Sequence, residues 1–428
     1  MGKIIYADHS ATTYVKDEVI KEMLPYFTLN YGNPSSAYSI GRVSKEAVEK
    51  ARIKVAKAIG AESNEIYFTA GGSESDNMII KGIARANKSK GKHIITTKIE
   101  HLAVLNTCKE LEEEGFEVTY LDVDDKGFIN LDELKRNIRS DTILISVMFA
   151  NNEIGTIEPI HEIGKIAKDI GIIFHTDAVQ AVGNVDIDVK KLNIDALSLS
   201  AHKFYGPKGV GAAYISSFVK FEPVINGGHQ ECSKRAGTEN VPGIVGLGKA
   251  IEIATSNIIE HSDKVKKIRD ELINDIESGI EGVILNGDRK ERLCSNVNFC
   301  IDGIDSESLV LMLDMNGICA SSGSACTAGI LAPSHVLTAI GRKDTIATSS
   351  IRFTFGEENT SEDVKVIYNV LKDVVTKLRK NKRTDEIKCK CTNRYWKKIN
   401  FIIKLIKQMK EEGIWKKIKE EFPWLCLL

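Results

Sequence analysis

Two residues with well-known chemical uses stand where short apolar segments end. Lys203 follows the apolar segment 194–199, and a lysine shielded by its neighbours forms a Schiff base with an aldehyde cofactor. Asp177 closes the segment 171–176, and Gln180 lies one helical step further on. A carboxylate in this position pairs with a protonated ring nitrogen, as in a pyridine cofactor. A solvated lysine and an aspartate that caps a helix fit the same pattern.

A glycine-rich turn and a histidine stand at two further segment ends. The turn 71–73 precedes a predicted helix at 74–84, and backbone N–H groups at a helix N-terminus bind phosphate. A tight strand-to-helix turn without a ligand also needs glycine. His101 comes just after the apolar segment 93–97. It is suited to stack on an aromatic cofactor and to carry protons, and a hydrogen-bonded structural histidine is the alternative.

One thiol, Cys326, stands among the small residues of segment 320–329. Such a segment has little to bury, so we expect an exposed, moving loop with an accessible cysteine. A thiol on a moving loop fits a nucleophile that acts at two places. A flexible linker with an incidental cysteine fits the same composition.

These residues need a scaffold, and the hydrophobic pattern predicts an α/β domain for it. Short Ile-rich runs alternate with charged amphipathic stretches between about residues 45 and 255. The expected strands are 65–69, 93–97, 142–147, 171–176 and 194–199, and the expected helices include 103–114 and 160–170. Runs that are apolar on both faces are typical of buried parallel strands. Because ligands bind at the carboxyl ends of such strands, the polar residues above are expected to meet there.

The pattern changes twice further along the chain, which predicts three parts. A large α/β domain is expected at 15–256, and a smaller α+β domain at 1–14 and 257–380. The extension 381–428 is basic, since residues 386–428 contain eleven Lys/Arg and five Glu. Its helical apolar face fits docking to a partner or membrane surface, with Cys389 and Cys391 as a thiol relay, or packing on its own domain.

Composition narrows the class of protein. The 428 residues contain 58 Lys+Arg and 59 Asp+Glu, so net charge gives no general attraction for nucleic acid or an anionic membrane. No apolar stretch approaches the roughly 18 residues of a transmembrane segment. The nine cysteines are scattered without disulfide-framework spacing or the paired Cys/His spacing of a metal site. A soluble, cytoplasmic protein with reduced thiols and no metal is therefore expected.

Taken together, the motifs resemble the cysteine desulfurases of the NifS/IscS type, a branch of the class-V aminotransferases and fold-type-I pyridoxal-phosphate enzymes. The resemblance runs from about residue 6 to 380. Its markers are Asp8-His9-Ser10-Ala11-Thr12-Thr13, the segments 32–36 and 68–77, Glu100-His101, Asn151-Asn152-Glu153-Ile154-Gly155, segment 175–180, His202-Lys203, segment 235–240, Ser321 to Cys326, and segment 349–353. The Ser-Ser-Gly-Ser-Ala-Cys segment is similar to the long-loop class, which passes sulfur to scaffold proteins.

The resemblance implies a large domain with a mostly parallel seven-stranded sheet, a smaller α+β domain, a homodimer and pyridoxal 5'-phosphate. Lys203 would hold the cofactor, Asp177 would pair with its ring nitrogen, His101 would stack on the ring, and Gln180 would contact its phenolic oxygen. The phosphate would be bound by Gly72, Ser73, Ser200 and His202, and by Thr238 of the neighbouring subunit. The substrate carboxylate would be held by Asn33, Asn152 and Arg352, with Asn152 also in the cofactor site.

The implied activity is removal of sulfur from L-cysteine to give L-alanine. Lys203 would move the α-proton, Cys326 would take the sulfur as a persulfide, and His101 would transfer protons. The sulfur would pass to an acceptor for iron–sulfur cluster assembly or for other sulfur-containing products. Two other functions stay open: a lyase for selenocysteine or another β-substituted amino acid, and a degenerate homologue that acts as a scaffold or regulator.

Overall fold

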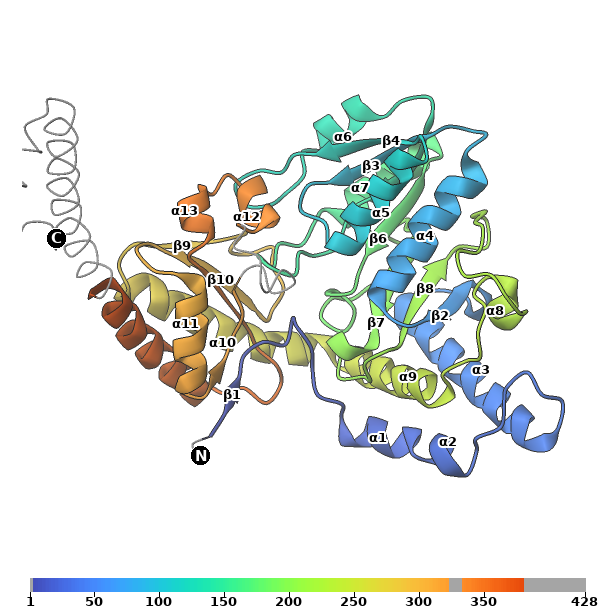
Figure 1. Cartoon of the computed structure of the whole chain (residues 1–428), viewed down its shortest axis with the longest axis horizontal. Coiled ribbons are helices and arrows are strands. Elements are labelled where there is room, and N and C mark those ends of the chain that lie inside the picture. Colours follow the sequence, from blue (N-terminus) through green and yellow to red (C-terminus); the bar gives the residue numbers. More distant parts are fainter. Residues whose placement is uncertain (1–2, 323–332, 381–428) are drawn as a thin grey trace, which may run out of the picture. The chain divides into compact units, whose positions relative to one another are not determined.

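A computed structural model describes residues 3–322 and 333–380 (Figure 1). Cys326 and the extension 381–428 lie outside the described residues. The chain divides into a unit Met1–Lys372 and a unit Asp373–Leu428, and the strands and named helices all belong to the first. Within the described ranges, no helix combines the length and the apolar character needed to cross a membrane.

A seven-stranded sheet forms the centre of the first unit. Its strands stand in the order β2-β8-β7-β6-β5-β3-β4, and only β8 runs antiparallel to its neighbours. This arrangement confirms the predicted fold class. The strands are β2 (Ile66–Thr69), β3 (His93–Thr97), β4 (Glu117–Leu121), β5 (Thr142–Ser146), β6 (Ile173–Asp177), β7 (Ala196–Ser200) and β8 (Gly211–Ile215).

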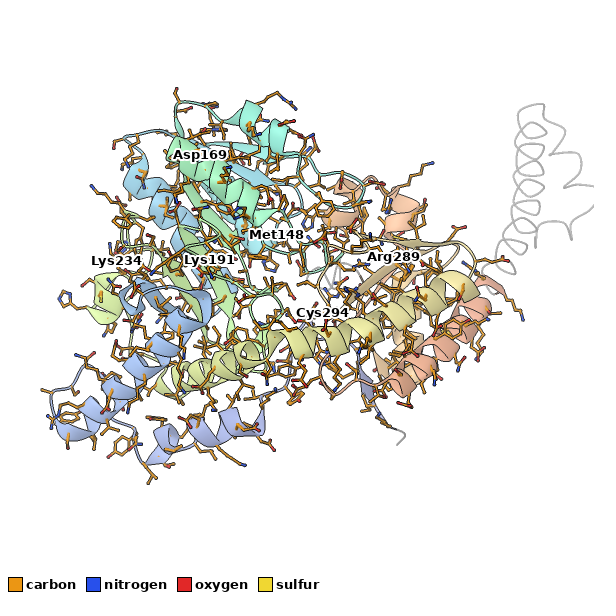
Figure 2. The ribbon with its side chains drawn as sticks, turned by 180° about the vertical axis from the view of Figure 1, so that it is seen from behind. Met148, Asp169, Lys191, Lys234, Arg289 and Cys294 are labelled. Carbon is orange, nitrogen blue, oxygen red and sulfur yellow. The ribbon has the colours of Figure 1, made fainter. Side chains whose placement is uncertain are left out.

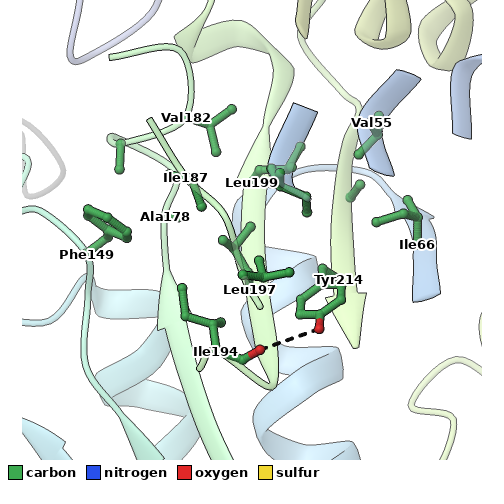
Figure 3. Close-up of a cluster of buried hydrophobic side chains, with 14 of the residues drawn as sticks. Val55, Ile66, Phe149, Ala178, Val182, Ile187, Ile194, Leu197, Leu199 and Tyr214 are labelled. Carbon is green, nitrogen blue, oxygen red and sulfur yellow. Dashed lines mark hydrogen bonds between the residues drawn. The ribbon is translucent and has the colours of Figure 1, made fainter. Parts of the chain in front are cut away.

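Helices cover both faces of this sheet because its strands are apolar on both sides. Ile94 packs in one buried cluster with residues of α4 (Gly72–Asn87) and α5 (Leu102–Glu113). The next residue, Ile95, points to the opposite face. It belongs to a second cluster (Figure 3) that contains residues of α3 (Ser39–Ile59), α7 (Ile160–Ile170) and α9 (Val241–Ser256). Sequential strands and helices thus bury one continuous sheet.

Smaller elements surround a second, three-stranded antiparallel sheet in the order β12-β10-β9. A short parallel pair joins β1 to β11. The strands are β1 (Ile5–Tyr6), β9 (Val283–Leu285), β10 (Asn296–Ile301), β11 (Ile318–Cys319) and β12 (Ser350–Thr354). The further helices are α1 (Asp17–Met23), α2 (Pro25–Thr28), α6 (Leu131–Asn137), α8 (Gln230–Ser233), α10 (Ile258–Gly279), α11 (Ser306–Met315), α12 (His335–Ala339) and α13 (Asp344–Ala347).

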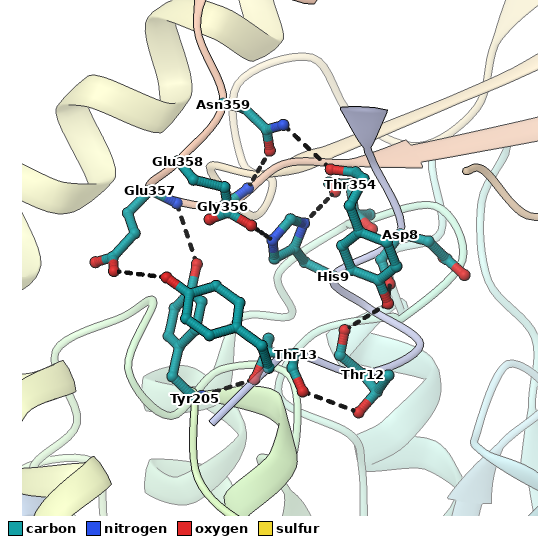
Figure 4. Close-up of polar contacts among 12 residues, drawn as sticks. Asp8, His9, Thr12, Thr13, Tyr205, Thr354, Gly356, Glu357, Glu358 and Asn359 are labelled. Carbon is teal, nitrogen blue, oxygen red and sulfur yellow. Dashed lines mark hydrogen bonds and ion pairs between the residues drawn. The ribbon is translucent and has the colours of Figure 1, made fainter. Parts of the chain in front are cut away.

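The N-terminal segment connects the small sheet to the turn after β7 (Figure 4). The ring nitrogens of His9 lie 2.9 Å from the Thr354 carbonyl oxygen and 2.7 Å from Glu358 Oε1. Four residues later, the Thr13 hydroxyl accepts a hydrogen bond from the Tyr205 N–H at 2.8 Å. The segment is therefore tied at one end to β12 and at the other to the turn that holds Lys203.

A buried ion pair holds the loop that follows β8, and its removal is expected to destabilise the fold. Glu231 accepts two hydrogen bonds from the Arg52 guanidinium, at 2.7 and 2.8 Å, and one from the Phe68 N–H at 2.8 Å. Glu231→Ala leaves Arg52, whose side chain is 11% exposed, without its main partner, so we expect a loss of about 3–5 kcal/mol in urea unfolding. Glu49→Ala removes the half-exposed partner of Arg52 and is expected to cost below about 1 kcal/mol. Equal losses would contradict this difference.

Candidate active site

A cavity of about 380 Å³ lies at the carboxyl ends of β6 and β7, beside the start of α4. Its volume is in the range of small-molecule sites. Figure 2 labels Met148, one of its lining residues. The lining includes the predicted site residues Gly72, Ser73, His101, Asn152, Asp177, Gln180, His202, Lys203 and Arg352. It also includes Ser10, Ala11, Asp76, Met148, Ala150 and Val179.

This cavity is distinguished by its chemistry rather than by its size. A larger hollow of about 1120 Å³ lies beside Asn257 and Thr360, and its lining contains none of the predicted site residues. The described residues contain no group of three His, Cys, Asp or Glu side chains placed to hold a metal ion. The smaller cavity is therefore the candidate active site.

The Lys203 amine is placed by the turn that follows β7. The strand ends at Ser200, and a 3-10 turn over Ala201–Lys203 carries the lysine into the cavity lining. Its Nζ donates to the backbone carbonyl of Ala11 at 2.8 Å and also to that of Ser10. The N-terminal segment thus supplies acceptors for a primary amine at the cavity wall.

Two buried carboxyl groups, Asp76 and Asp177, also line the cavity. Asp177 ends β6, and its Oδ1 accepts the Val179 N–H at 2.9 Å. No helix begins after Asp177, so the helix-cap alternative is wrong. Burial raises the pKa of Asp177, while His101 and Lys203 oppose the shift. Burial, followed by repulsion from Asp177, raises the pKa of Asp76 well above its usual value. Two carboxyl groups here favour a protonated, cationic ring nitrogen.

Asp76 is a site residue that the sequence reasoning did not find. It stands four residues after Gly72, the first residue of α4, and therefore on the same helix face. Its Oδ1 is buried without a hydrogen-bond partner and lies 3.8 Å from His175 Nε2. The helical spacing from the glycine turn is the signal that identifies it.

The start of α4 forms a cradle suited to a phosphate group. Gly71 has φ of +152°, a conformation that glycine adopts readily, and α4 begins at the next residue. A Cβ atom at Gly72 would lie 2.5 Å from Val179 Cγ2, so this position has room for glycine alone. The Ser73 side chain and the ring of His202 complete the lining. Backbone N–H groups, hydroxyls and the helix dipole together attract an anion.

His202 and His101 are both held in defined hydrogen bonds. Burial, helped by the charges of Lys203 and Lys208, lowers the pKa of His202 to about 4, so its ring is neutral at pH 7. His101 Nδ1 accepts the Ala103 N–H at 3.1 Å and caps α5. The alternative that His101 is a hydrogen-bonded structural histidine is therefore partly right, since one of its ring nitrogens caps a helix. The proton of the neutral ring then stands on Nε2.

Arg352 supplies a buried cation on the side of the small sheet. Its side chain is 2% exposed. Nη1 donates to the Asn152 carbonyl and Nη2 to Asp8 Oδ1, both at 2.9 Å. Its Nε is buried without a hydrogen-bond partner. A guanidinium in this state suits a carboxylate ligand.

Among the described residues, three predicted site residues do not line this cavity. Ser200 is buried at the end of β7, near the glycine turn. Asn33 and Thr238 are exposed, and the predicted role of Thr238 belongs to a neighbouring subunit. Cys326 lies outside the described residues. The individual roles of all the predicted site residues, including those that line the cavity, stay predictions.

Glu100, directly before His101, offers a test of burial through pH. Burial raises the pKa of its carboxyl group from 4.5 to about 8. The contribution of this group to the free energy of unfolding is therefore fully present below about pH 4.5 and is lost as pH rises through 8. The loss is on the order of 5 kcal/mol at most. Glu100→Gln is expected to remove this loss, so the variant gains stability relative to the native chain between pH 5 and 9. Urea unfolding of both proteins at pH 5 and pH 9 measures the gain. The same change in unfolding free energy with pH in the native chain and in Glu100→Gln would contradict it.

Comparisons with known proteins agree with this arrangement. Residues 5–367 match the family model described as Aminotransferase class-V. The chain is 58% identical over 381 residues to the cysteine desulfurase IscS of Clostridium botulinum, which covers 89% of this chain and 96% of the relative. It is 59% identical over 378 residues to the cysteine desulfurase IscS of Methanosarcina thermophila, covering 88% and 93%. A solved NifS-like protein has a TM-score of 0.82 at 38% identity, covering 87% of this chain and 99% of that one.

Proposed function

This chain belongs to the class-V aminotransferase family, and within it we propose that the protein is a pyridoxal-phosphate-dependent cysteine desulfurase. The observation that carries the proposal is the placement of the Lys203 amine, the Asp177 carboxylate and the Arg352 guanidinium in one cavity. The relatives that are about 58% identical over nearly nine-tenths of the chain bear the same activity in their names. The substrate is L-cysteine and the products are L-alanine and a persulfide on Cys326.

The donor groups of the cavity fit pyridoxal 5'-phosphate. Asp177 would hold the ring nitrogen, the start of α4 with Ser73 and His202 would hold the phosphate, and Lys203 would hold the aldehyde carbon. Gln180 and His101 would contact the ring. When bound, this cofactor supplies a carbonyl that takes up amines and a ring that accepts electrons.

The chain's own residues then divide the remaining work. Arg352, together with Asn152, binds the carboxylate of L-cysteine and fixes the orientation of its α-carbon. The Lys203 amine takes the α-proton and later returns it. His101 Nε2 is placed to exchange a proton with the substrate, a contribution typical of a general acid or base.

Cys326 takes the sulfur. Its thiolate attacks the sulfur of the substrate, so that an S–S bond forms as the substrate C–S bond breaks. The electron pair of the C–S bond stays with carbon, which takes up a proton and leaves as L-alanine. The persulfide sulfur is then passed to an acceptor protein for iron–sulfur cluster assembly or another sulfur-containing product. The cytoplasmic location predicted from the cysteines stays a prediction.

The protein is also proposed to act as a homodimer. Thr238 is exposed on this chain, which is consistent with a role in the neighbouring subunit's phosphate site. The region from α1 to the start of α3 exposes several large apolar side chains, which favours an interface between proteins. These include Leu24, Phe27, Leu29, Tyr31 and Tyr38, exposed by 56% or more. Light scattering of the full-length protein tests this assembly.

Alanine release from L-cysteine tests the proposed activity. Purified full-length protein is incubated with L-cysteine and an excess of thiol reductant, which releases persulfide sulfur as sulfide. Equal amounts of alanine and sulfide are expected. A cofactor-loaded protein that releases no alanine from L-cysteine but acts on selenocysteine would favour the lyase alternative. A protein that binds no cofactor would favour the scaffold alternative.

A further inference from the structure

Asp8 and Glu153 have no part in the proposed reaction, although each is joined to a residue of the candidate active site. The carboxyl group of each accepts a hydrogen bond from a serine. The Ser321 hydroxyl donates to Asp8 Oδ2 at 2.7 Å. The Ser334 hydroxyl donates to Glu153 Oε2 at 2.5 Å. In the sequence these serines flank residues 323–332, which include Cys326. Hydroxyl-to-carboxylate bonds are among the stronger hydrogen bonds in proteins.

Ser321 is joined to Arg352 in two ways. The backbone groups of the two residues form an antiparallel bridge, with the Ser321 N–H donating at 3.2 Å and the Arg352 N–H donating at 2.7 Å. Asp8 links their side chains, since its Oδ1 accepts from Arg352 at 2.9 Å while its Oδ2 accepts from Ser321. The position of Ser321 is thus tied to the guanidinium that faces the substrate carboxylate.

Ser334 is joined through Glu153 to the segment that contains Asn152, a residue of the cavity lining. The main chain of Glu153 is held on both sides, because its N–H donates to Asn151 Oδ1 at 2.9 Å and its carbonyl accepts from the side chains of Asn296 and Asn298. Glu153 follows Asn152 directly. The next residue along from Ser334, His335, lies 2.9 Å from the Glu100 carbonyl through Nε2.

Two residues of the cavity lining act electrostatically on the Glu153 carboxyl group. Burial raises its pKa to about 7, and the Ser334 hydroxyl, Arg352 and His101 oppose that shift. The charges that act on this carboxyl group are therefore those of the proposed substrate-binding cation and of the proposed proton carrier. Its hydrogen bond to Ser334 connects the segment that contains Asn152, a lining residue, with the residues that follow segment 323–332.

We propose that Asp8 and Glu153 are positioning residues that fix Ser321 and Ser334, which stand in the sequence on either side of the segment that contains Cys326. The role rests on the proposed function, in which Cys326 is the nucleophile. Misplacement of a nucleophile by about 1 Å lowers a rate on the order of 100-fold. Neither serine lines the cofactor cavity, so binding of cofactor and L-cysteine should survive their replacement.

The test compares Ser321→Ala and Ser334→Ala with a matched control, Ser44→Ala. Ser44 is fully buried in α3 and donates its hydroxyl to the Asn30 carbonyl at 3.0 Å, away from the cavity. On cofactor-loaded full-length protein, three quantities are measured: the dissociation constant of L-cysteine from the cofactor absorbance, the single-turnover rate of Cys326 persulfide formation, and amide hydrogen exchange at residues 318–322 and 333–338.

Each serine variant at the segment ends is expected to lower persulfide formation by roughly 10- to 100-fold, following the cost of misplacement. The L-cysteine dissociation constant should change by less than about 2-fold, and amide exchange next to the replaced serine should become faster. The control should match the native protein in all three. Native persulfide rates and native amide exchange in both variants would overturn the inference. A weakening of L-cysteine binding as large as the loss in persulfide rate would also overturn it. If the native protein forms no persulfide, the proposed function fails, and hydrogen exchange alone decides whether the two anchors exist.

Discussion

Lys203→Ala is expected to lower alanine release from L-cysteine by about 10⁴-fold. The variant loses the only amine in the described cavity lining that can move the α-proton. Its hydrogen bonds to the carbonyls of Ser10 and Ala11 are lost as well. Asp177, the α4 cradle and Arg352 are unchanged, so the cavity still binds an anionic, aromatic ligand.

The measurement pairs the alanine assay with a hydride-reduction experiment that traps a Schiff base on lysine, followed by mass spectrometry. Native protein should carry the trapped cofactor at residue 203, and the variant should carry none. Lys208→Ala is the control, because Lys208 is an exposed lysine five residues away and should retain activity within about 3-fold. A small primary amine added to the Lys203→Ala variant should restore part of the α-proton transfer. Native activity in this variant would exclude Lys203 as the base.

The sequence was sufficient to predict the sheet because its central strands are apolar on both faces. The strand ends differ by one or two residues from expectation, for a physical reason. Asp177 and Ser200 look polar enough to end a strand, but their backbones continue the ladder, with Asp177 paired to Ser198 and Ser200 paired to Gly211. Hydrogen bonding, which the hydrophobic pattern does not record, extends each strand to the residue that faces the cavity.

Two strands and several site residues were beyond the sequence pattern. β8 begins with Gly211-Ala212-Ala213, and these small side chains give a weak strand signal. Position 211 requires glycine, because a Cβ atom there would lie 2.7 Å from Gly71 Cα. β4 is an edge strand with an exposed first residue and weak alternation. Asp8 and Glu153 each depend on a partner more than 20 residues away, and a single sequence does not reveal such contacts. Residues at strand ends were predictable, whereas residues that act through tertiary contacts were not.

Cys326→Ala is expected to separate cofactor binding from sulfur transfer. The proposed function gives Cys326 no part in holding the cofactor, so the variant should keep the native yellow absorbance and should still change colour when L-cysteine binds. Without the thiolate there is no nucleophile to take the substrate sulfur. Alanine and sulfide release should therefore fall on the order of 10³-fold or more.

Cys232→Ala provides the matched control, because Cys232 is an exposed free thiol in α8. Its removal takes away an exposed thiol without touching the cavity lining. After one turnover in the absence of reductant, alkylation and mass spectrometry should locate one extra sulfur atom at residue 326 in the native chain and in Cys232→Ala. The same sulfur at Cys232, or undiminished alanine release from Cys326→Ala, would move the nucleophile elsewhere. Such a result would also remove the basis for anchoring residues at Ser321 and Ser334, because their proposed effect on rate passes through the thiol between them.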